Sequence, residues 1–330
     1  NNYEWTYGTH TPSGDDTYTA EYDINPATGV ATLAGSNSKV YDGKAVTTTE
    51  VNKDGKIIVD LTLPVYKQTD DEPQLLRTVD LGKYTLQDGD YTWASGAAPT
   101  KGGTYTINLN KDKILAHLQD QFNTLAGTGT DPDDETKSMS NVTIDTNDMD
   151  GQADFDINTT VTYQFVDDDN NKSNVGDPEV VTGLNGNSQT VSLVVPDNYV
   201  LAAGQTLPTS VTFGDTNTTV DIHLKHATKT VDKNNVPDGY TKDDFAKTIN
   251  RTITAKEPTG DVDLSQTTEL TRTGTYDEVT KKVISYGNWT TGSFDEVTAP
   301  EVAGYTPSQA KVDRADVTVD SKFDPTVITY

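Results

Sequence analysis

Apolar and polar positions alternate over many short stretches of the chain, which is typical of half-buried β-strands. Val220, Ile222 and Leu224 alternate with polar residues, so we expect these three side chains to point inward. Turn residues separate the stretches, and a hairpin is expected at 18–33. The same reasoning predicts strands at 57–63, 91–94, 105–109, 142–144, 161–166, 251–254, 268–273 and 282–286.

One segment, 111–126, follows a helical period instead. Asn110 can cap its start, and Gly127 follows its end. Five apolar side chains fall within one stripe at about 100° per residue: Ile114, Leu115, Leu118, Phe122 and Leu125. We expect this helix to pack on a sheet, so the fold class is mainly β with minor α (α+β).

Length and composition favour several small modules over one large domain. The 330 residues are 33% hydrophobic, which fills several thin cores better than one deep core. Acidic, turn-rich stretches separate the strand groups. We therefore expect an elongated tandem array of small β-rich modules, with boundaries near residues 35, 158 and 229.

Charge and residue content exclude several classes of partner and site. The chain has 51 acidic against 25 basic residues, a net charge of −26, which repels nucleic acid and anionic lipid. No stretch approaches the roughly 18 apolar residues of a membrane span, so membrane insertion is not expected. With no Cys, disulfides and thiolate metal sites are excluded.

Catalytic motifs are missing from the sequence, which has no GxSxG, HExxH, P-loop or GxGxxG pattern. His223 and His226 differ in strand parity, which favours a solvated strand end over a shared metal site. We predict that the chain is not an enzyme. A carbohydrate-active enzyme is kept as a weaker alternative, because two carboxylates across a sugar suffice for hydrolysis.

Acid-rich segments on both sides of residues 142–144 make calcium the one cofactor that the sequence leaves open. Calcium takes about six to eight oxygen ligands, and these segments are rich in carboxylates, although none follows the EF-hand register. Solvated acidic loops are the alternative interpretation. The candidate ligands are Asp131, Asp133, Asp134, Asp145, Asn147, Asp148 and Asp150.

Motifs in the last eighty residues carry a resemblance to a known family. The stretches 251–253, 270–273, 276–280, 286–292 and 304–310 resemble, in order and spacing, the second half of the Mub-type mucus-binding repeat (MucBP-like) of lactobacillus surface adhesins. Lys281 departs from the pattern, because the family usually has a glycine there.

Two earlier parts of the chain extend the resemblance. Residues 161–168 and 223–226 look like the start and end of the first half of the same repeat. Residues 38–44, 84–93 and 102–107 resemble the MBG modules found beside such repeats. The chain is thus divided into an N-terminal hairpin segment or end of a preceding module at 1–34, an MBG-like module at 35–157, and the two Mub-like halves at 158–228 and 229–330.

The resemblance implies a fold, a location and a set of partners. The Mub-like halves are expected to be β-grasp (ubiquitin-like). The protein is expected outside the cell, on the surface of a lactic acid bacterium, and held in the wall through a segment outside these residues. Family members bind mucus glycoproteins, so mucin glycoproteins or their glycans are the expected partners, with immunoglobulins as a second class.

Trp289 and Tyr305 are the candidate ligand-binding residues, because an aromatic face packs well against the C–H surface of a sugar. The alternative is that Trp289 is a core residue of the last module. At the level of the whole chain, the leading hypothesis is a non-catalytic adhesin for mucin glycans. Its rival is a structural stalk that presents a distal binding domain, and the residues alone do not separate the two.

The charge balance predicts how mucin binding depends on pH and salt. Both this chain and acidic mucin are anionic at pH 7, so long-range repulsion opposes their encounter. Carboxylates with ordinary pKa values near 4 protonate as the pH falls, and salt screens charges beyond about 10 Å. Binding to immobilised mucin can be titrated from about pH 7.4 to 4 at two salt concentrations. We expect binding to rise as the pH falls, and we expect added salt not to weaken it at neutral pH. Binding that is strongest at neutral pH and collapses in salt would contradict this account.

Overall fold

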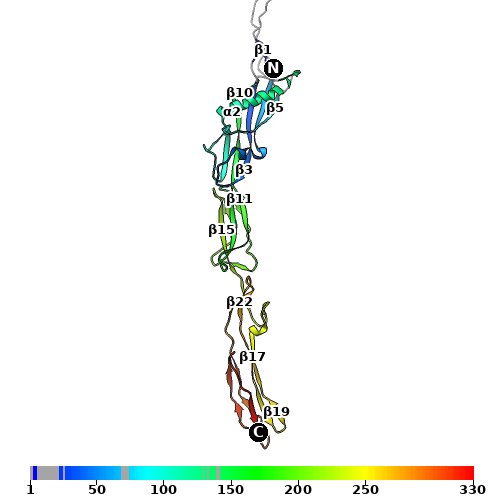
Figure 1. Cartoon of the computed structure of the whole chain (residues 1–330), viewed down its shortest axis with the longest axis vertical. Helices are drawn as coiled ribbons and strands as arrows, with labels where there is room; N and C mark the ends of the chain where they lie inside the picture. The colour runs from blue at the N-terminus through cyan, green and yellow to red at the C-terminus, as the bar shows by residue number, and fades with distance from the viewer. Residues whose placement is uncertain are drawn as a thin grey trace, which may run out of the picture. The chain divides into compact units, whose positions relative to one another are not determined.

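The computed structural model shows a mainly β chain with several small sheets and one long helix, as predicted (Figure 1). It describes residues 3–5, 22–24, 27–67, 74–128, 130–131, 134–138 and 142–330. The chain divides into two compact units. The first comprises Asn1–Tyr163, Pro178–Ser192 and Pro208–Val220, and the second comprises Gln164–Asp177, Leu193–Leu207 and Asp221–Tyr330.

The main sheet of the first unit is built around β3, a strand that pairs antiparallel with β4 and parallel with β10. Strand β5 continues the sheet beyond β4, and β7 joins β10 to β6. These strands are β3 (Ala27–Val40), β4 (Ile57–Lys67), β5 (Gln74–Tyr84), β6 (Tyr91–Trp93), β7 (Gly103–Leu109) and β10 (Val142–Asp167). Strand β3 is therefore an interior strand of the sheet, with hydrogen-bonded neighbours on both edges.

Alternate residues of these strands bury one core, as the period of the sequence predicted. Leu33, Leu61 and Phe155 are almost completely removed from water. Helix α2 (Lys111–Thr128) covers this core with Ile114 and Leu118, both fully buried. The predicted helix is therefore confirmed, while the side chains of Phe122 and Leu125 lie outside the described residues.

The hairpin predicted at 18–33 is wrong, because its two expected strands pair with other strands and not with each other. Residues 30–33 of β3 pair with 59–62 of β4, because the long β3 strand belongs in the main sheet. Strand β2 (Tyr22–Ile24) pairs instead with β1 (Tyr3–Trp5), and residues 18–21 lie outside the described part of the chain.

Short elements complete the first unit. Thr47 and Glu50 form a capping box at the start of α1, and the buried amide of Asn37 donates to the carbonyl oxygens of Glu50, Val51 and Lys53. These bonds tie the helical turn to β3. The elements are α1 (Thr48–Val51), the 3₁₀ turn η1 (Lys53–Gly55), β8 (Thr130–Asp131), β9 (Asp134–Ser138), β12 (Ser188–Thr190) and β14 (Ser210–Thr212).

Strands β10, β11 (Ser173–Gly183) and β15 (Thr218–His226) have residues in both units. On β15, Ile222 and Leu224 are buried as predicted. Val220 is 39% exposed, so the prediction that it points inward is wrong. The alternation sets the face on which a side chain lies, but burial also needs another element above that face.

In the second unit, β13 (Tyr199–Leu201) pairs with β15, and the strands from β16 onward form two- and three-stranded sheets. These strands are β16 (Thr228–Val231), β17 (Ala246–Arg251), β18 (Ile253–Glu257), β19 (Gly260–Asp263), β20 (Gln266–Thr271), β21 (Gly274–Asp277), β22 (Lys282–Tyr286), β23 (Gly292–Phe294), β24 (Val297–Thr298), β25 (Lys311–Val312), β26 (Ala315–Val317) and β27 (Thr326–Thr329), and η2 (Lys242–Asp244) is a 3₁₀ turn. The pairs include β16 with β21, β21 with β22, and β18 in parallel with β27.

Three small cores hold these sheets. One contains Phe245, the next Phe294 and the third Ile253, each with only a few buried neighbours. The guanidinium of Arg251, which is 3% exposed, lies 5.2 Å from the centre of the Phe294 ring and donates to the carbonyl oxygens of Asp295 and Asp313, each at 2.7 Å. This buried cation fixes the loops that follow β23 and β25.

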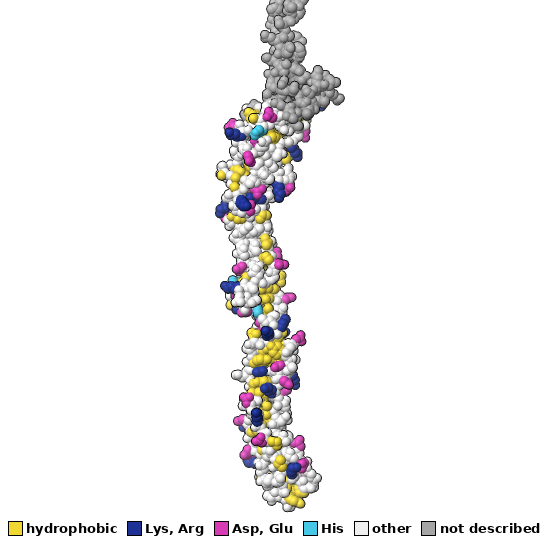
Figure 2. Space-filling model, in the orientation of Figure 1, with side chains coloured by type: hydrophobic (Ala, Val, Ile, Leu, Met, Phe, Trp, Pro, Cys, Tyr) yellow, Lys and Arg dark blue, Asp and Glu magenta, His cyan; other side chains and the backbone are white. Residues whose placement is uncertain are grey.

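Within the described ranges, no helix has the length and apolar content needed to cross a membrane. On the face shown in Figure 2, basic and acidic side chains are interspersed rather than gathered into separate patches. A large basic surface for nucleic acid is therefore not visible on this face. The module boundaries near residues 35, 158 and 229, and the β-grasp fold of the Mub-like halves, stay predictions.

Separate cores predict separate unfolding transitions. Phe155→Ala should lower the stability of the first unit by about 3 to 5 kcal/mol, the usual cost of emptying a buried phenylalanine site. Phe294→Ala should do the same for the second unit. Both effects are measured by unfolding the whole chain in denaturant and monitoring the amide hydrogen exchange of each unit separately. Equal destabilisation of both units by either variant would show that the cores are coupled.

Candidate functional site

Trp289 lies in the loop between β22 and β23, and two hydrogen bonds fix that loop. The amide of Gly287 donates to the carbonyl oxygen of Thr273 at 2.9 Å, and the amide of Thr290 donates to that of Thr271 at 2.8 Å. The indole is partly buried against the core that contains Phe294. One side of Trp289 therefore has the core role that the sequence allowed, while part of the ring stays accessible.

Two cations and a second aromatic ring surround this indole. The guanidinium carbon of Arg272 lies 3.7 Å from the centre of the Tyr286 ring and 4.6 Å from that of Trp289. The Nζ atom of Lys247 lies 5.5 Å from the centre of the indole. We call Lys247, Arg272, Tyr286 and Trp289 the aromatic–cation surface.

The aromatic–cation surface is held in place and keeps its hydrogen-bonding groups. The Nε atom of Arg272 donates to the carbonyl oxygen of Asp244 at 2.8 Å, which fixes the guanidinium between the rings. Tyr286 is 40% exposed. Burial, and then the negative charge of Asp244, raise the pKa of its hydroxyl above 10.0, so it is neutral at physiological pH and can both donate and accept.

A shallow groove adjoins this surface through Lys247. Its lining residues are Lys242, Asp243, Ala246, Lys247, Thr248, Ile249 and Glu269. Lys242 and Lys233 both form ion pairs with Glu269. The groove therefore offers a mixture of charged groups and hydroxyls beside an aromatic face.

Tyr305, the second sequence-predicted ligand residue, lies in the loop between β24 and β25. It is 54% exposed, and its amide donates to the carbonyl oxygen of Val302. The same loop is tied to β27 by a hydrogen bond from the amide of Ser308 to Thr329. Trp289 packs against the Phe294 core and Tyr305 belongs to a loop beside the Ile253 core, so the aromatic–cation surface is built without Tyr305.

The candidate calcium ligands fall mostly outside the described side chains: Asp131, Asp133, Asp134, Asp145 and Asp148. Asn147 and Asp150 lie on β10 and are exposed, and Asp150 accepts a hydrogen bond from the amide of Gly151 at 2.6 Å. A calcium site formed by these residues stays a prediction.

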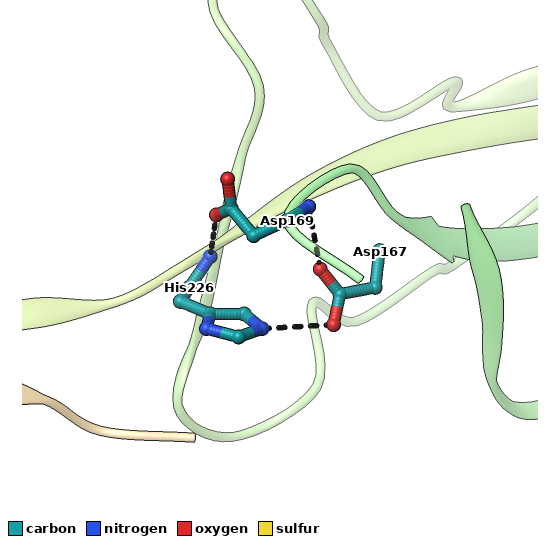
Figure 3. Close-up of side chains that lie close together, drawn as sticks. All are labelled: Asp167, Asp169 and His226. Carbon is teal, nitrogen blue, oxygen red and sulfur yellow. Dashed lines mark hydrogen bonds and ion pairs between the residues drawn. The ribbon is translucent and has the colours of Figure 1, made fainter. Parts of the chain in front are cut away.

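A second cluster, around His226 at the end of β15, was not expected from the sequence (Figure 3). Nδ1 of the imidazole lies 2.6 Å from Oδ2 of Asp277, and Nε2 lies 2.9 Å from Oδ2 of Asp167. The side chains of His226, Asp167 and Asp277 are 8%, 2% and 8% exposed. The predicted solvated strand end is therefore wrong for His226, because two carboxylates from other elements close over it.

His223 has a different environment from His226, as their opposite strand parity implied. Its Nδ1 atom lies 2.7 Å from Oδ1 of Asp168, and its side chain is 30% exposed. His117, on helix α2, contacts Asp90 in the first unit and is about half exposed. These two histidines each have one carboxylate partner within the described residues, whereas His226 has two.

The His226 cluster holds side chains that could in principle bind a metal. Among the described residues, Asp167, Asp169 and His226 bring ligand-type atoms within 4.8 Å of one another. Internal hydrogen bonds already use these atoms, since Asp169 accepts from the amide of His226 at 2.9 Å and from Lys225 at 2.7 Å. The geometry is that of an ion-paired hydrogen-bond network, and we assign no metal to it.

Neither cluster has a local signature in the sequence. Arg272 and Trp289 are 17 residues apart along the printed sequence, and only the pairing of the loop with Thr271 and Thr273 brings them together. The partners of His226 are 59 residues before and 51 residues after it. The available signal covered only part of the cluster: Asp167 directly follows the predicted strand at 161–166, and His226 follows the alternation of Val220, Ile222 and Leu224, whereas Asp277 lies between two predicted strands.

Comparisons with known proteins agree with two of the three parts of the chain that carried the resemblance. Residues 28–159 match the family model of the MBG domain, and residues 240–330 match that of the Muc B2-like domain. No curated protein matches the chain significantly. The first Mub-like half, at 158–228, stays a prediction.

Three solved structures are similar to parts of the chain. The crystal structure of Mub-RV is 25% identical, with a TM-score of 0.37, over 52% of this chain and 97% of its own. The type 2 repeat of the mucus binding protein MUB from Lactobacillus reuteri is 24% identical, with a TM-score of 0.31, over 52% and 98%. The mucin-binding domain of Spr1345 from Streptococcus pneumoniae is 33% identical, with a TM-score of 0.24, over 32% and 94%.

The family matches place the aromatic–cation surface within residues 240–330. Neither matching family is a catalytic one. The chain therefore carries an MBG domain at residues 28–159 and a Muc B2-like domain at residues 240–330.

Proposed function

We propose that this chain is part of an extracellular surface adhesin and that its Muc B2-like domain binds mucin-type glycans on the aromatic–cation surface. The observation that carries the proposal is the position of Arg272, which lies over both Tyr286 and Trp289 while Lys247 approaches the same indole. Such a grouping on an accessible face combines flat apolar area with cationic donors.

The chemistry of this surface suits an acidic sugar. The accessible part of an aromatic ring packs against sugar C–H groups, and a neutral tyrosine hydroxyl pairs with sugar hydroxyls. Lysine and arginine donate charge-assisted hydrogen bonds to a carboxylate or sulfate. Mucin glycans that end in sialic acid or sulfate present both kinds of group.

The neighbouring groove gives a longer glycan a path beyond the indole. Lys247 belongs to both the groove and the aromatic–cation surface, so a sugar stacked on Trp289 would have its next residues beside Thr248 and Glu269. Hydroxyl and carboxylate groups of this kind pair with neutral sugar hydroxyls. The aromatic–cation surface and the groove together are therefore expected to hold more than one sugar ring.

Lys247→Ala tests the site with little risk to the fold, because Lys247 is exposed. A charge-assisted hydrogen bond from an exposed lysine to a sugar carboxylate or sulfate contributes about 0.5 to 2 kcal/mol. Affinity for immobilised mucin should therefore fall about 2- to 30-fold, measured by biolayer interferometry at pH 5 and constant salt. Trp289→Phe should also weaken binding, because phenylalanine keeps apolar packing but has a smaller face.

Two variants serve as controls for this experiment. Lys256→Ala removes one exposed lysine elsewhere in the same domain, where Lys256 pairs with Asp261, and should leave binding unchanged. Tyr305→Ala tests the second sequence-predicted residue separately. Unchanged binding in both Lys247→Ala and Trp289→Phe would reject the aromatic–cation surface as the site. An absence of mucin binding by the unaltered chain would favour the structural stalk.

A further inference from the structure

The imidazole of His226 is enclosed by acceptors on both of its nitrogens. Asp277 lies at hydrogen-bond distance from Nδ1, and Asp167 lies at hydrogen-bond distance from Nε2. A neutral imidazole carries one N–H, so one of its nitrogens would face a carboxylate without a proton between them. The imidazolium form donates to both carboxylates at once and supplies the positive charge that two buried anions need.

The three residues come from both sides of the predicted boundary at 228 and 229. Asp167 ends β10, His226 ends β15, and Asp277 ends β21. The backbone crosses the same place, because the amide of Glu278 donates to the carbonyl oxygen of Ala227 at 2.9 Å and Thr228 pairs with Asp277. The histidine thus bridges strands that precede the boundary to a strand that follows it, all within the second unit.

Other charged and titratable groups face this bridge. The hydroxyl of Tyr199, on β13, lies 3.4 Å from Oδ2 of Asp167, and its ring meets the imidazole edge to face at 5.7 Å. Asp169 accepts from the amide of His226 and is paired with Lys225 of β15. Lys229, on β16, forms an ion pair with Glu278 at 3.1 Å. Lys225 and Lys229 each have a carboxylate partner of their own, so the imidazolium is the cation placed between Asp167 and Asp277.

We infer that His226 is a proton-operated latch, which in its protonated form fastens β10 and β15 to β21 and which loosens this joint when it loses its proton. On deprotonation, one of the two buried carboxylates loses the imidazole N–H, and both lose the positive charge between them, although Asp277 keeps the amides of Val279 and Thr280 and Asp167 keeps the amide of Asp169. Two buried anions without a counter-charge are unfavourable, so water enters the joint or Asp277 moves away. The device goes beyond the proposed glycan binding and does not depend on it.

The direction of the titration follows from the surroundings. Burial alone would lower the pKa of His226, but hydrogen bonds to Asp277 and Asp167 and their charges outweigh burial and raise the pKa above its ordinary value of 6.5. Because the folded state binds this proton more tightly than the unfolded state, the stabilisation is fully present below pH 6.5. It is lost as the pH rises through the raised pKa.

Asp277 sets the acid limit of the same device. Burial would raise the pKa of Asp277, but hydrogen bonds from His226 and from the amides of Thr280 and Val279 hold it at about 2, against an ordinary 3.8. Its contribution is present above pH 3.8 and is lost only as the pH falls through about 2. The latch is therefore fully closed from about pH 3.8 up to the region of the raised pKa of His226.

The protonation state is measured directly on the unaltered full-length chain. Histidine labelled with ¹⁵N gives separate NMR signals for the four histidines, and His226→Gln identifies the one that disappears. We expect this histidine to carry protons on both nitrogens at pH 6 and to titrate with a midpoint above 6.5. A neutral tautomer at pH 6, or a midpoint at or below 6.5, would overturn the inference.

The mechanical consequence is measured by hydrogen exchange at the joint. Protection of the amides of Ala227 and Glu278, corrected for intrinsic exchange rates, reports its opening. His226→Gln should lower that protection about tenfold near pH 5.5, the usual order of the cost when a buried polar group loses its partner. The two proteins should become alike well above the midpoint.

His223→Gln is the matched control, because His223 lies on the same strand and pairs with Asp168. It should leave the protection of Ala227 and Glu278 unchanged. Equal loss of protection in both variants, or no loss in His226→Gln, would contradict the latch. A rise in melting temperature with zinc chloride that disappears in His226→Gln would instead show a metal site. All of these outcomes are independent of mucin binding.

Discussion

Burial of a few large side chains between small sheets is the constraint on which the rest of this chain depends. Phe155, Phe245 and Phe294 each belong to a different core, and the cores of the second unit contain only a few buried residues. Hydrophobic burial contributes in proportion to the area removed from water, so small cores give each sheet a modest margin. Polar contacts must then fix the loops between them, and Arg251 does so through two carbonyl groups.

This dependence explains which features could be read from the sequence. The stripe that contains Ile114 and Leu118 and the alternation of Ile222 and Leu224 are local patterns, and both are buried as expected. The exposure of Val220 depends on what lies above its face, which no local pattern specifies. The sequence also raised two roles for Trp289: its packing against the Phe294 core fits the first, and its role in ligand binding stays a prediction.

The His226 cluster could not be predicted because its strongest contacts are nonlocal. Asp167 and Asp277 come from strands far away along the chain, and strand parity alone left His226 at an open end. Burial of two carboxylates around an imidazole is a property of the assembled joint. In the same way, Arg272 reaches Trp289 only because the loop after β22 folds back on Thr271 and Thr273.

In a chain with a strongly negative charge, the positions of the basic side chains Lys247 and Arg272 matter for the proposed binding of an anionic ligand. Acidic and basic groups are interspersed on the visible face, so no broad basic patch competes with Lys247 and Arg272 (Figure 2). Salt screens the long-range repulsion between this chain and an anionic ligand more than it screens a direct contact between a cation and that ligand. Specificity can therefore reside in a small surface even though the whole chain carries a charge of −26.

The parallel pairing of β18 with β27 has a mechanical consequence. Four residue pairs join these strands, from Ile253 with Thr326 to Lys256 with Thr329, and β27 ends one residue before the last residue of the chain. Tension applied to the two ends of the domain would pull parallel strands along their axes in opposite directions. Their hydrogen bonds would be loaded together in shear rather than opened one after another. This geometry makes the pairing of β18 with β27 resistant to pulling along the strands.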